Sequence, residues 1–139
     1  MTGARTTRKP RPEPASPVLR TYIERLRRLG VTNESVLDAF GQVPRHLFLD
    51  QAHAVYAYDD MAIPIGSGQT ISKPSTVGRM LELLVEDLKP GEKLGKVLEV
   101  GTGCGYQASV LAKLAKEVYS VERIKSLHEQ TRENIRPLH

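Results

Sequence analysis

The chain has 139 residues and a formal net charge of +4, with 40% hydrophobic and 26% charged residues, which is ordinary for one soluble domain. No apolar run approaches the roughly 20 residues that span a bilayer, and the basic, proline-rich start lacks the apolar core of a secretory signal. We therefore expect a cytoplasmic protein. Its single cysteine, Cys104, excludes an internal disulfide.

The positive charge lies in residues 1–20, and the remaining chain is neutral. Residues 1–17 contain four prolines and almost no large apolar side chain. Such a segment cannot bury enough surface to offset its chain entropy, so we expect a disordered, solubilising tail. A weak nucleic-acid contact by this tail is the minor alternative. The folded domain is then expected to comprise residues 18–139.

The first half of this domain is predicted to be mainly helical. Apolar residues at helical spacing predict an amphipathic helix that Gly30 ends; they are Leu19, Tyr22, Ile23, Leu26 and Leu29. A second helix is expected over about 33–41, with Val36, Leu37 and Phe40 facing inward. Residues 43–49 read as a turn and a short apolar segment. Residues 51–60 fit either a short helix or irregular packing, and both stay open.

Residues 62–74 are rich in glycine, hydroxyl side chains and proline, and we expect a loop. The loop leads into a helix whose buried side is predicted as Val77, Met80, Leu81 and Leu84. Ser72 stands where an N-cap belongs, and Pro74 falls in the first turn. This segment therefore places Gln69, Thr70, Ile71 and Ser72 just before a helix N-terminus.

Residues 96–106 are the most informative stretch of the chain. A strand over 96–100 ends in a turn with glycines at 101, 103 and 105, and a helix follows. Its buried side is predicted as Val110, Leu111, Leu114 and Ala115. A strand over 118–121 and a helix over 124–136 complete an alternating pattern typical of a doubly wound parallel α/β sheet.

This pattern yields only two parallel strands, whereas an open α/β sheet usually has five or more. We therefore expect an incomplete sheet in this chain. Residues 18–95 are interpreted as a helical cap with an active-site loop, and residues 96–139 as the start of a cofactor-binding βαβα unit.

The glycine turn is expected to point free backbone N–H groups at a ligand. A dinucleotide motif, G-x-G-x-x-G/A, fits from Gly103 through Gly105 and Ala108 but fails from Gly101, so spacing does not choose the ligand. Glu99 favours S-adenosylmethionine, since an acid at this strand end can lie near the cationic end of that cofactor. Glu122 ends the next strand and can accept the ribose hydroxyls of either ligand.

Three segments resemble protein-L-isoaspartate O-methyltransferase, a class I S-adenosylmethionine-dependent methyltransferase. They are residues 64–74 (PIGSGQTISKP), 101–107 (GTGCGYQ) and 120–124 (SVERI), and residues 43–48 (VPRHLF) agree with them. The resemblance implies a Rossmann-like fold and Ser72 as the catalytic serine. It further implies that cofactor and substrate are lined by Gln69, Thr70, Ile71, Ser72, Glu99, Gly101, Gly103, Gly105 and Glu122.

The family repairs damaged proteins by methylating the α-carboxyl of L-isoaspartyl residues, and the ester then collapses to a succinimide without the enzyme. That carboxylate is ionised near pH 7, so alignment with the sulfonium methyl, rather than a strong base, is expected to drive the reaction. Proteins and peptides with such residues are the implied partners. Because the family's later strands do not follow, we expect little or no activity from this chain.

Two other interpretations remain beside the repair methyltransferase. One is a class I methyltransferase with a different substrate, and the other is a non-catalytic fragment that self-associates through its unfinished sheet edge. The four histidines, His46, His53, His128 and His139, show no metal-ligand spacing, so no metal is expected. Asp59 and Asp60 read as solvated surface, and Cys104 as a space-filler rather than a reactive thiol.

Overall fold

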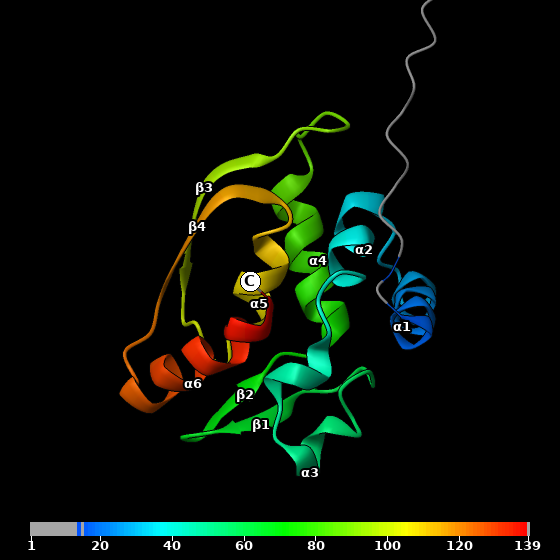
Figure 1. Ribbon diagram of the computed structural model, residues 1–139. Helices are drawn as coiled ribbons and strands as arrows, with labels where there is room; N and C mark the ends of the chain where they lie inside the picture. The colour runs from blue at the N-terminus through cyan, green and yellow to red at the C-terminus, as the bar shows by residue number, and fades with distance from the viewer. Residues whose placement is uncertain (1–13, 15, 139) are drawn as a thin grey trace, which may run out of the picture.

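The computed structural model describes residue 14 and residues 16–138. The predicted tail therefore lies almost wholly outside the described residues. Figure 1 shows the sheet of β3 and β4 on one side of the molecule and the N-terminal helices on the other. The elements are α1 (Pro17–Arg28), α2 (Glu34–Phe40), η1 (Arg45–Phe48), α3 (Gln51–Ala54), β1 (Ile63–Gly66), β2 (Gln69–Ile71), α4 (Pro74–Val85), β3 (Leu94–Val100), α5 (Tyr106–Leu111), β4 (Ala115–Val121), α6 (Lys125–Ile135) and η2 (Arg136–Leu138).

Helix α1 forms as predicted but begins one residue earlier. The Ser16 hydroxyl accepts a hydrogen bond from the Leu19 amide at 3.2 Å, and Pro17 occupies the first turn. The buried side is Leu19, Tyr22, Ile23 and Leu26. Leu29 was expected inside and is 49% exposed, because it lies past the last helical residue. Gly30 follows with φ +101°, the left-handed conformation typical of a helix end.

Residues 33–60 contain the second predicted helix and the segment that sequence left open. Asn33 caps α2 by accepting from the Val36 amide at 3.1 Å, and Val36, Leu37 and Phe40 are all buried as predicted. The open segment begins with the short helix α3 and continues as turns up to Asp60. Short helix and irregular chain are therefore both present there.

The loop expected over residues 62–74 is wrong in its central part. Strands β1 and β2 pair there as an antiparallel hairpin, with Ile63 opposite Ile71. Its tight turn places Gly66, Ser67 and Gly68 at positive φ. Each strand is too short for an alternating pattern to stand out, and Pro64 argues against a strand in sequence. In the structure, Ile63, Ile65 and Ile71 of the hairpin are buried in the core, which local sequence does not show.

Helix α4 is capped from a distance, so the prediction of Ser72 as its N-cap is wrong. The N-cap position is Lys73, which makes no side-chain capping bond. Asp60 instead accepts from the Ser75 amide at 2.8 Å and from the Ser75 hydroxyl at 2.7 Å. Asp60 was expected to be solvated surface. In the structure its carboxylate instead caps the N-terminus of α4.

The buried side of α4 is rotated from the predicted one. Met80 and Leu84 were expected inside, yet they are 45% and 48% exposed. The side that packs inward is Pro74, Val77, Gly78, Leu81 and Val85. Gly78 permits this close packing, because a Cβ there would lie 2.7 Å from a methyl group of Val31.

Strands β3 and β4 form the predicted parallel pair, in register from Leu94 opposite Ala115 to Val100 opposite Val121. Both strands begin earlier than predicted. Helix α5 ends at Leu111, so Leu114 and Ala115 are buried as expected but lie in the turn and the start of β4 rather than in the helix. Strand β4 then leads into α6, as predicted.

The two faces of this sheet differ. Val118 and Ser120 lie on the face that looks toward α5 and α6, whose side chains line a common cavity with them. The opposite face exposes large apolar side chains, namely Leu98 (63%), Val100 (80%), Tyr119 (55%) and Val121 (50%). Parallel sheets are normally covered on both faces, so this apolar face is unusual.

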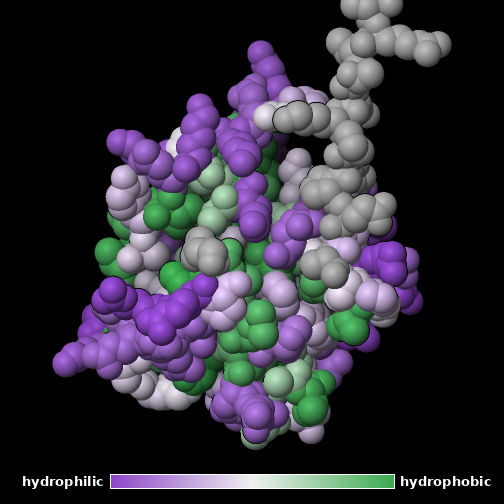
Figure 2. Space-filling view, viewed as in Figure 1, coloured by the Kyte–Doolittle hydropathy of each residue, from purple (hydrophilic) through white to green (hydrophobic). Residues whose placement is uncertain are grey.

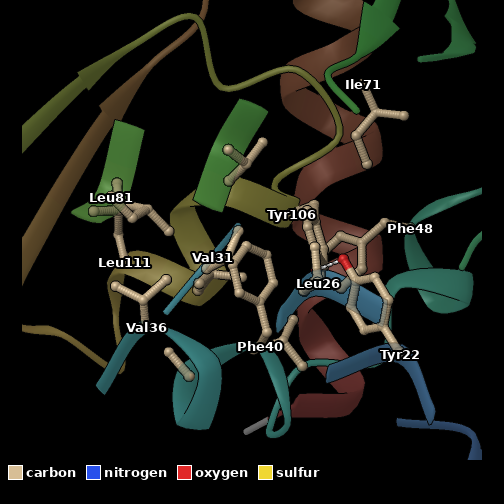
Figure 3. Close-up of a cluster of buried hydrophobic side chains, with 14 of the residues drawn as sticks. Tyr22, Leu26, Val31, Val36, Phe40, Phe48, Ile71, Leu81, Tyr106 and Leu111 are labelled. Carbon is tan, nitrogen blue, oxygen red and sulfur yellow. Dashed lines mark hydrogen bonds between the residues drawn. The ribbon is translucent and has the colours of Figure 1, made fainter. Parts of the chain in front are cut away.

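One hydrophobic cluster joins both halves of the described chain, from Leu19 in α1 to Leu127 in α6. Figure 3 shows Tyr22 and Tyr106 facing each other in this cluster, with their hydroxyl oxygens 3.0 Å apart. In Figure 2, hydrophilic side chains gather over α6 and over the loop before β3. Among the described residues, no helix combines the length and apolar character needed to cross a membrane.

Candidate functional site

A small pocket lies where the hairpin meets the glycine turn. Ser72 and Glu99, which are far apart in sequence, both line it. The remaining lining residues are Ile65, Thr70, Ile71, Val77, Gly101, Thr102, Gly103, Cys104, Tyr106 and Gln107. Its volume is about 80 Å³, whereas pockets for whole organic ligands usually measure about 300–1,000 Å³. The described residues therefore enclose only part of a cofactor-sized molecule.

The glycine turn is a backbone loop closed onto the end of β4. Gly101, Gly103 and Gly105 all have positive φ, at +90°, +57° and +91°. The amides of Gly101 and Thr102 donate to the carbonyl oxygen of Val121 at 2.8 and 3.2 Å. The Gly105 amide donates to the Thr102 carbonyl at 3.0 Å. The expectation of free N–H groups is therefore wrong for these three amides, because the turn itself uses them.

The amide of a further turn residue, Gly103, is occupied by Glu122. One carboxylate oxygen accepts from the Gly103 amide at 2.9 Å, and the other accepts from the Ile124 amide at 3.0 Å. These backbone hydrogen bonds lower the pKa of Glu122. An acid at the end of this strand also accepts ribose hydroxyls in dinucleotide sites, so Glu122 by itself fits either ligand.

Glu99 is a buried acid beside the pocket, only 6% exposed. Its carboxylate accepts from the Ser120 hydroxyl at 2.5 Å, and the Ser120 oxygen lies 2.6 Å from the Thr102 hydroxyl. Burial raises the pKa of Glu99, although the hydrogen bonds from Ser120 and Gln107 work against that rise. A cation placed in the pocket would relieve this buried negative charge.

Replacing Glu99 by glutamine is expected to stabilise the unliganded fold at neutral pH. Because the pKa of Glu99 is raised in the folded state, its stabilising contribution is present below the ordinary pKa and is lost as pH rises through the raised pKa. The glutamine side chain keeps an oxygen for Ser120 and carries no charge. Thermal unfolding of both chains from pH 4 to pH 8 should show the variant's advantage growing with pH; a constant difference would contradict the role of ionisation.

Helix α6 is hydrogen-bonded to the carbonyl groups of the glycine turn. The Thr131 hydroxyl donates to the Gly103 carbonyl at 2.8 Å, and the Asn134 side-chain amide donates to the Cys104 carbonyl at 3.0 Å. At the other end of α6, the Ser126 and Ser67 hydroxyl oxygens are 3.0 Å apart. The helix thus connects the turn to the tip of the hairpin.

The structure gathers most of the predicted site residues. Thr70, Ile71, Ser72, Glu99, Gly101 and Gly103 line the pocket. Glu122 lies next to it through Gly103, and Gly105 packs behind it against Thr131. Gln69 is exposed, pairs with Gly66 in the hairpin and is not among the lining residues. Its binding role stays a prediction.

Sequence reasoning missed the polar residues that support Glu99. Ser120 is the residue opposite Glu99 in the parallel register, and Gln107 lies on the first turn of α5. Parallel partners point to the same face, so pairing the two strands at their carboxyl ends could have identified Ser120. Gln107 is the last residue of the resemblance segment 101–107, but that resemblance assigned it no role.

Cys104, His46 and His53, which were also considered in the sequence, contact neighbouring residues of the fold. Cys104 is buried, and burial raises the pKa of its thiol, which agrees with a space-filling role. His46 Nδ1 lies 2.7 Å from the Tyr58 hydroxyl, and His53 pairs with Asp50. Within residues 14 and 16–138, no three His, Cys, Asp or Glu side chains form a group that could hold a metal ion.

A parallel strand, glycine turn and helix, with acids at the carboxyl ends of both strands, define a Rossmann-like cofactor-binding α/β protein. The family model of protein-L-isoaspartate(D-aspartate) O-methyltransferase (PCMT) matches residues 19–139. The chain belongs to this family. The predicted class, the N-terminal part of a class I methyltransferase fold, is thereby confirmed.

Relatives and solved structures agree with this membership. A protein-L-isoaspartate O-methyltransferase of Leptothrix cholodnii is 60% identical over 84% of this chain and 41% of its own length. One of Chromobacterium violaceum is 56% identical over 84% of this chain and 51% of its own. A Plasmodium falciparum structure assigned to the same enzyme, in complex with S-adenosyl-L-homocysteine, has a TM-score of 0.70 at 29% identity, covering 84% of this chain and 54% of that one. The chain thus spans about half or less of each.

Proposed function

We propose that this chain is the cofactor- and serine-bearing part of a protein-repair methyltransferase. It would transfer a methyl group from S-adenosylmethionine to the α-carboxyl of L-isoaspartyl residues in damaged proteins. The observation that carries the proposal is the single pocket shared by Ser72, the glycine turn and Glu99. Protein repair of this kind fits the predicted cytoplasmic location, which stays part of the proposal.

The residues present fit S-adenosylmethionine better than a dinucleotide. Glu99 offers a buried negative charge to the cofactor's ammonium group, and Glu122 has oxygen lone pairs at the pocket edge for ribose hydroxyls. Gly101 leaves room for close approach, since a Cβ there would meet nothing within 4 Å. When bound, the cofactor would supply an electrophilic sulfonium methyl. Thr70 and Ile71 would form the wall between cofactor and substrate.

Ser72 is proposed as the catalytic residue because its exposed side chain lies at the pocket and is not needed to cap α4. The substrate carboxylate is already an anion near pH 7. A serine hydroxyl can therefore donate to one of its oxygens and orient the other toward the methyl group. Alignment of this kind contributes to rate by removing orientational freedom before the reaction.

Labelled methyl transfer tests the proposal. The chain is mixed at stoichiometric concentration with labelled S-adenosylmethionine and a peptide containing L-isoaspartate, so that slow transfer by a partly enclosed pocket is still measured. The matched control is the same peptide with ordinary aspartate. We expect label only on the isoaspartyl peptide; equal labelling of the two would indicate another substrate, and no labelling with tight cofactor binding would indicate a non-catalytic protein.

Self-association is a second proposal, supported by the uncovered face of the β3–β4 sheet. Leu98, Val100, Tyr119 and Val121 form an apolar surface there, and both strands have unpaired edges in the described residues. A second copy could cover this face. Sedimentation velocity at rising concentrations should show dimers that Leu98→Lys abolishes, whereas a monomer at all concentrations would remove this proposal.

A further inference from the structure

Arg45 is a buried cation that the proposed reaction does not use. Its side chain is 0% exposed, and none of the described carboxylates lies within ion-pair distance of it. Its Nε is buried without a hydrogen-bond partner. Burying a guanidinium without an ion-pair partner costs free energy of folding. Other contacts must therefore offset that cost.

The compensating contacts are two backbone carbonyls. One terminal nitrogen of Arg45 donates to the Ser72 carbonyl at 3.1 Å, and the other donates to the Met61 carbonyl at 3.2 Å. These two carbonyls flank the hairpin, whose paired ladder ends at Ile63 and Ile71. The guanidinium therefore joins the two chain segments just where their strand pairing stops.

Arg45 also contacts the element that follows the glycine turn. Its guanidinium carbon lies 5.1 Å from the ring centroid of Tyr106, the first residue of α5. Tyr106 is itself fixed in the core by the Tyr22 hydroxyl and by an edge contact with the Phe48 ring (Figure 3). One side chain thus connects both ends of the hairpin to the start of α5.

We infer that Arg45 is a positioning residue that fixes the main chain at Ser72 relative to the glycine turn. A planar guanidinium can donate to two acceptors at once in a fixed geometry. A lysine ammonium keeps the charge but lacks the rigid, two-pronged donor. The importance of this geometry for catalysis rests on the proposed function, whereas the link to the hairpin does not.

Hydrogen exchange of Arg45→Lys tests the inference without any assay of activity. We expect amides of residues 61–72 to exchange about tenfold faster or more, as for loss of a charge-assisted hydrogen bond. Residues 94–100 in β3 should change much less. Val36→Ala, a truncation of a fully buried residue on α2, is the control for general loss of stability. An Arg45→Lys exchange profile that matches this control, or an unchanged hairpin, would overturn the inference.

The wild-type chain offers a second measurement in case the variant does not fold. A guanidinium held at both ends rotates slowly, so the Arg45 Nη hydrogens should give separate NMR signals. Arg79, whose side chain is 68% exposed, should show averaged signals in the same spectrum. Averaged signals for Arg45 would contradict the proposed link, through its guanidinium, between the Ser72 and Met61 carbonyls.

A kinetic comparison then relates this link to the reaction. Arg45→Lys should lower kcat for the isoaspartyl peptide by a larger factor than it weakens cofactor binding, because Ser72 lies in the loosened segment whereas Glu99 and Glu122 do not. An unchanged kcat despite a loosened hairpin would show that Arg45 does not position Ser72 for catalysis. If the wild-type chain transfers no methyl group, the proposed function fails, and hydrogen exchange and NMR still decide the structural link.

Discussion

Replacing Ser72 by alanine is expected to lower kcat for methyl transfer to an isoaspartyl peptide about 100-fold, the usual cost of removing one oriented donor at a reacting centre. The loss should appear in kcat because the hydroxyl would align the substrate carboxylate. Cofactor affinity should remain close to wild type, since the acids proposed to bind it are on other elements. Single-turnover kinetics and calorimetric titration with S-adenosylmethionine measure the two quantities separately.

The structure removes the usual ambiguity of such a serine variant. Ser72 could have been an N-cap, whose loss destabilises a helix by about 1 kcal/mol. Because Asp60 performs that function through Ser75, Ser72→Ala should change the free energy of unfolding by less than about 0.5 kcal/mol. Ser67→Ala, in the turn of the same hairpin, is the matched control and should retain most of the rate. An equal loss from both variants would argue against a specific role of Ser72.

Replacing Gly105 by alanine is expected to destabilise the fold by about 2–4 kcal/mol, the sum of backbone strain and overpacking. Gly105 has φ +91°, and a Cβ there would lie 2.7 Å from the Thr131 methyl group. Chemical denaturation measures the change. Gly95→Ala is the control, because its Cβ would meet nothing within 4 Å and its φ is ordinary.

A double variant separates the two causes of that loss. Thr131→Ser removes the methyl group while keeping the hydroxyl that binds the Gly103 carbonyl. In this background, Gly105→Ala should lose the steric part of its cost and keep the part due to positive φ. Full additivity of the two substitutions would show that the close contact with Thr131 does not matter.

Ser72 and Glu99 show which part of the site the sequence predicts and which part only the structure adds. Each residue was identified from its local motif and the family resemblance, and the structure places both in one pocket. The amides of the glycine turn show the opposite case. A glycine pattern predicts the shape of a turn, but it does not reveal that Val121 and Glu122 already accept from those amides.

Sequence by itself determined the local elements whose cause is local. The spacing of Leu19, Tyr22 and Leu26 predicts α1, and the apolar run into the glycines predicts β3 and its turn, because period and φ preference are properties of neighbouring residues. Tertiary structure alone decided the β1–β2 hairpin, the capping of α4 by Asp60 and the burial of Arg45. Each of these depends on partners distant along the chain, whose contacts no periodicity or composition records.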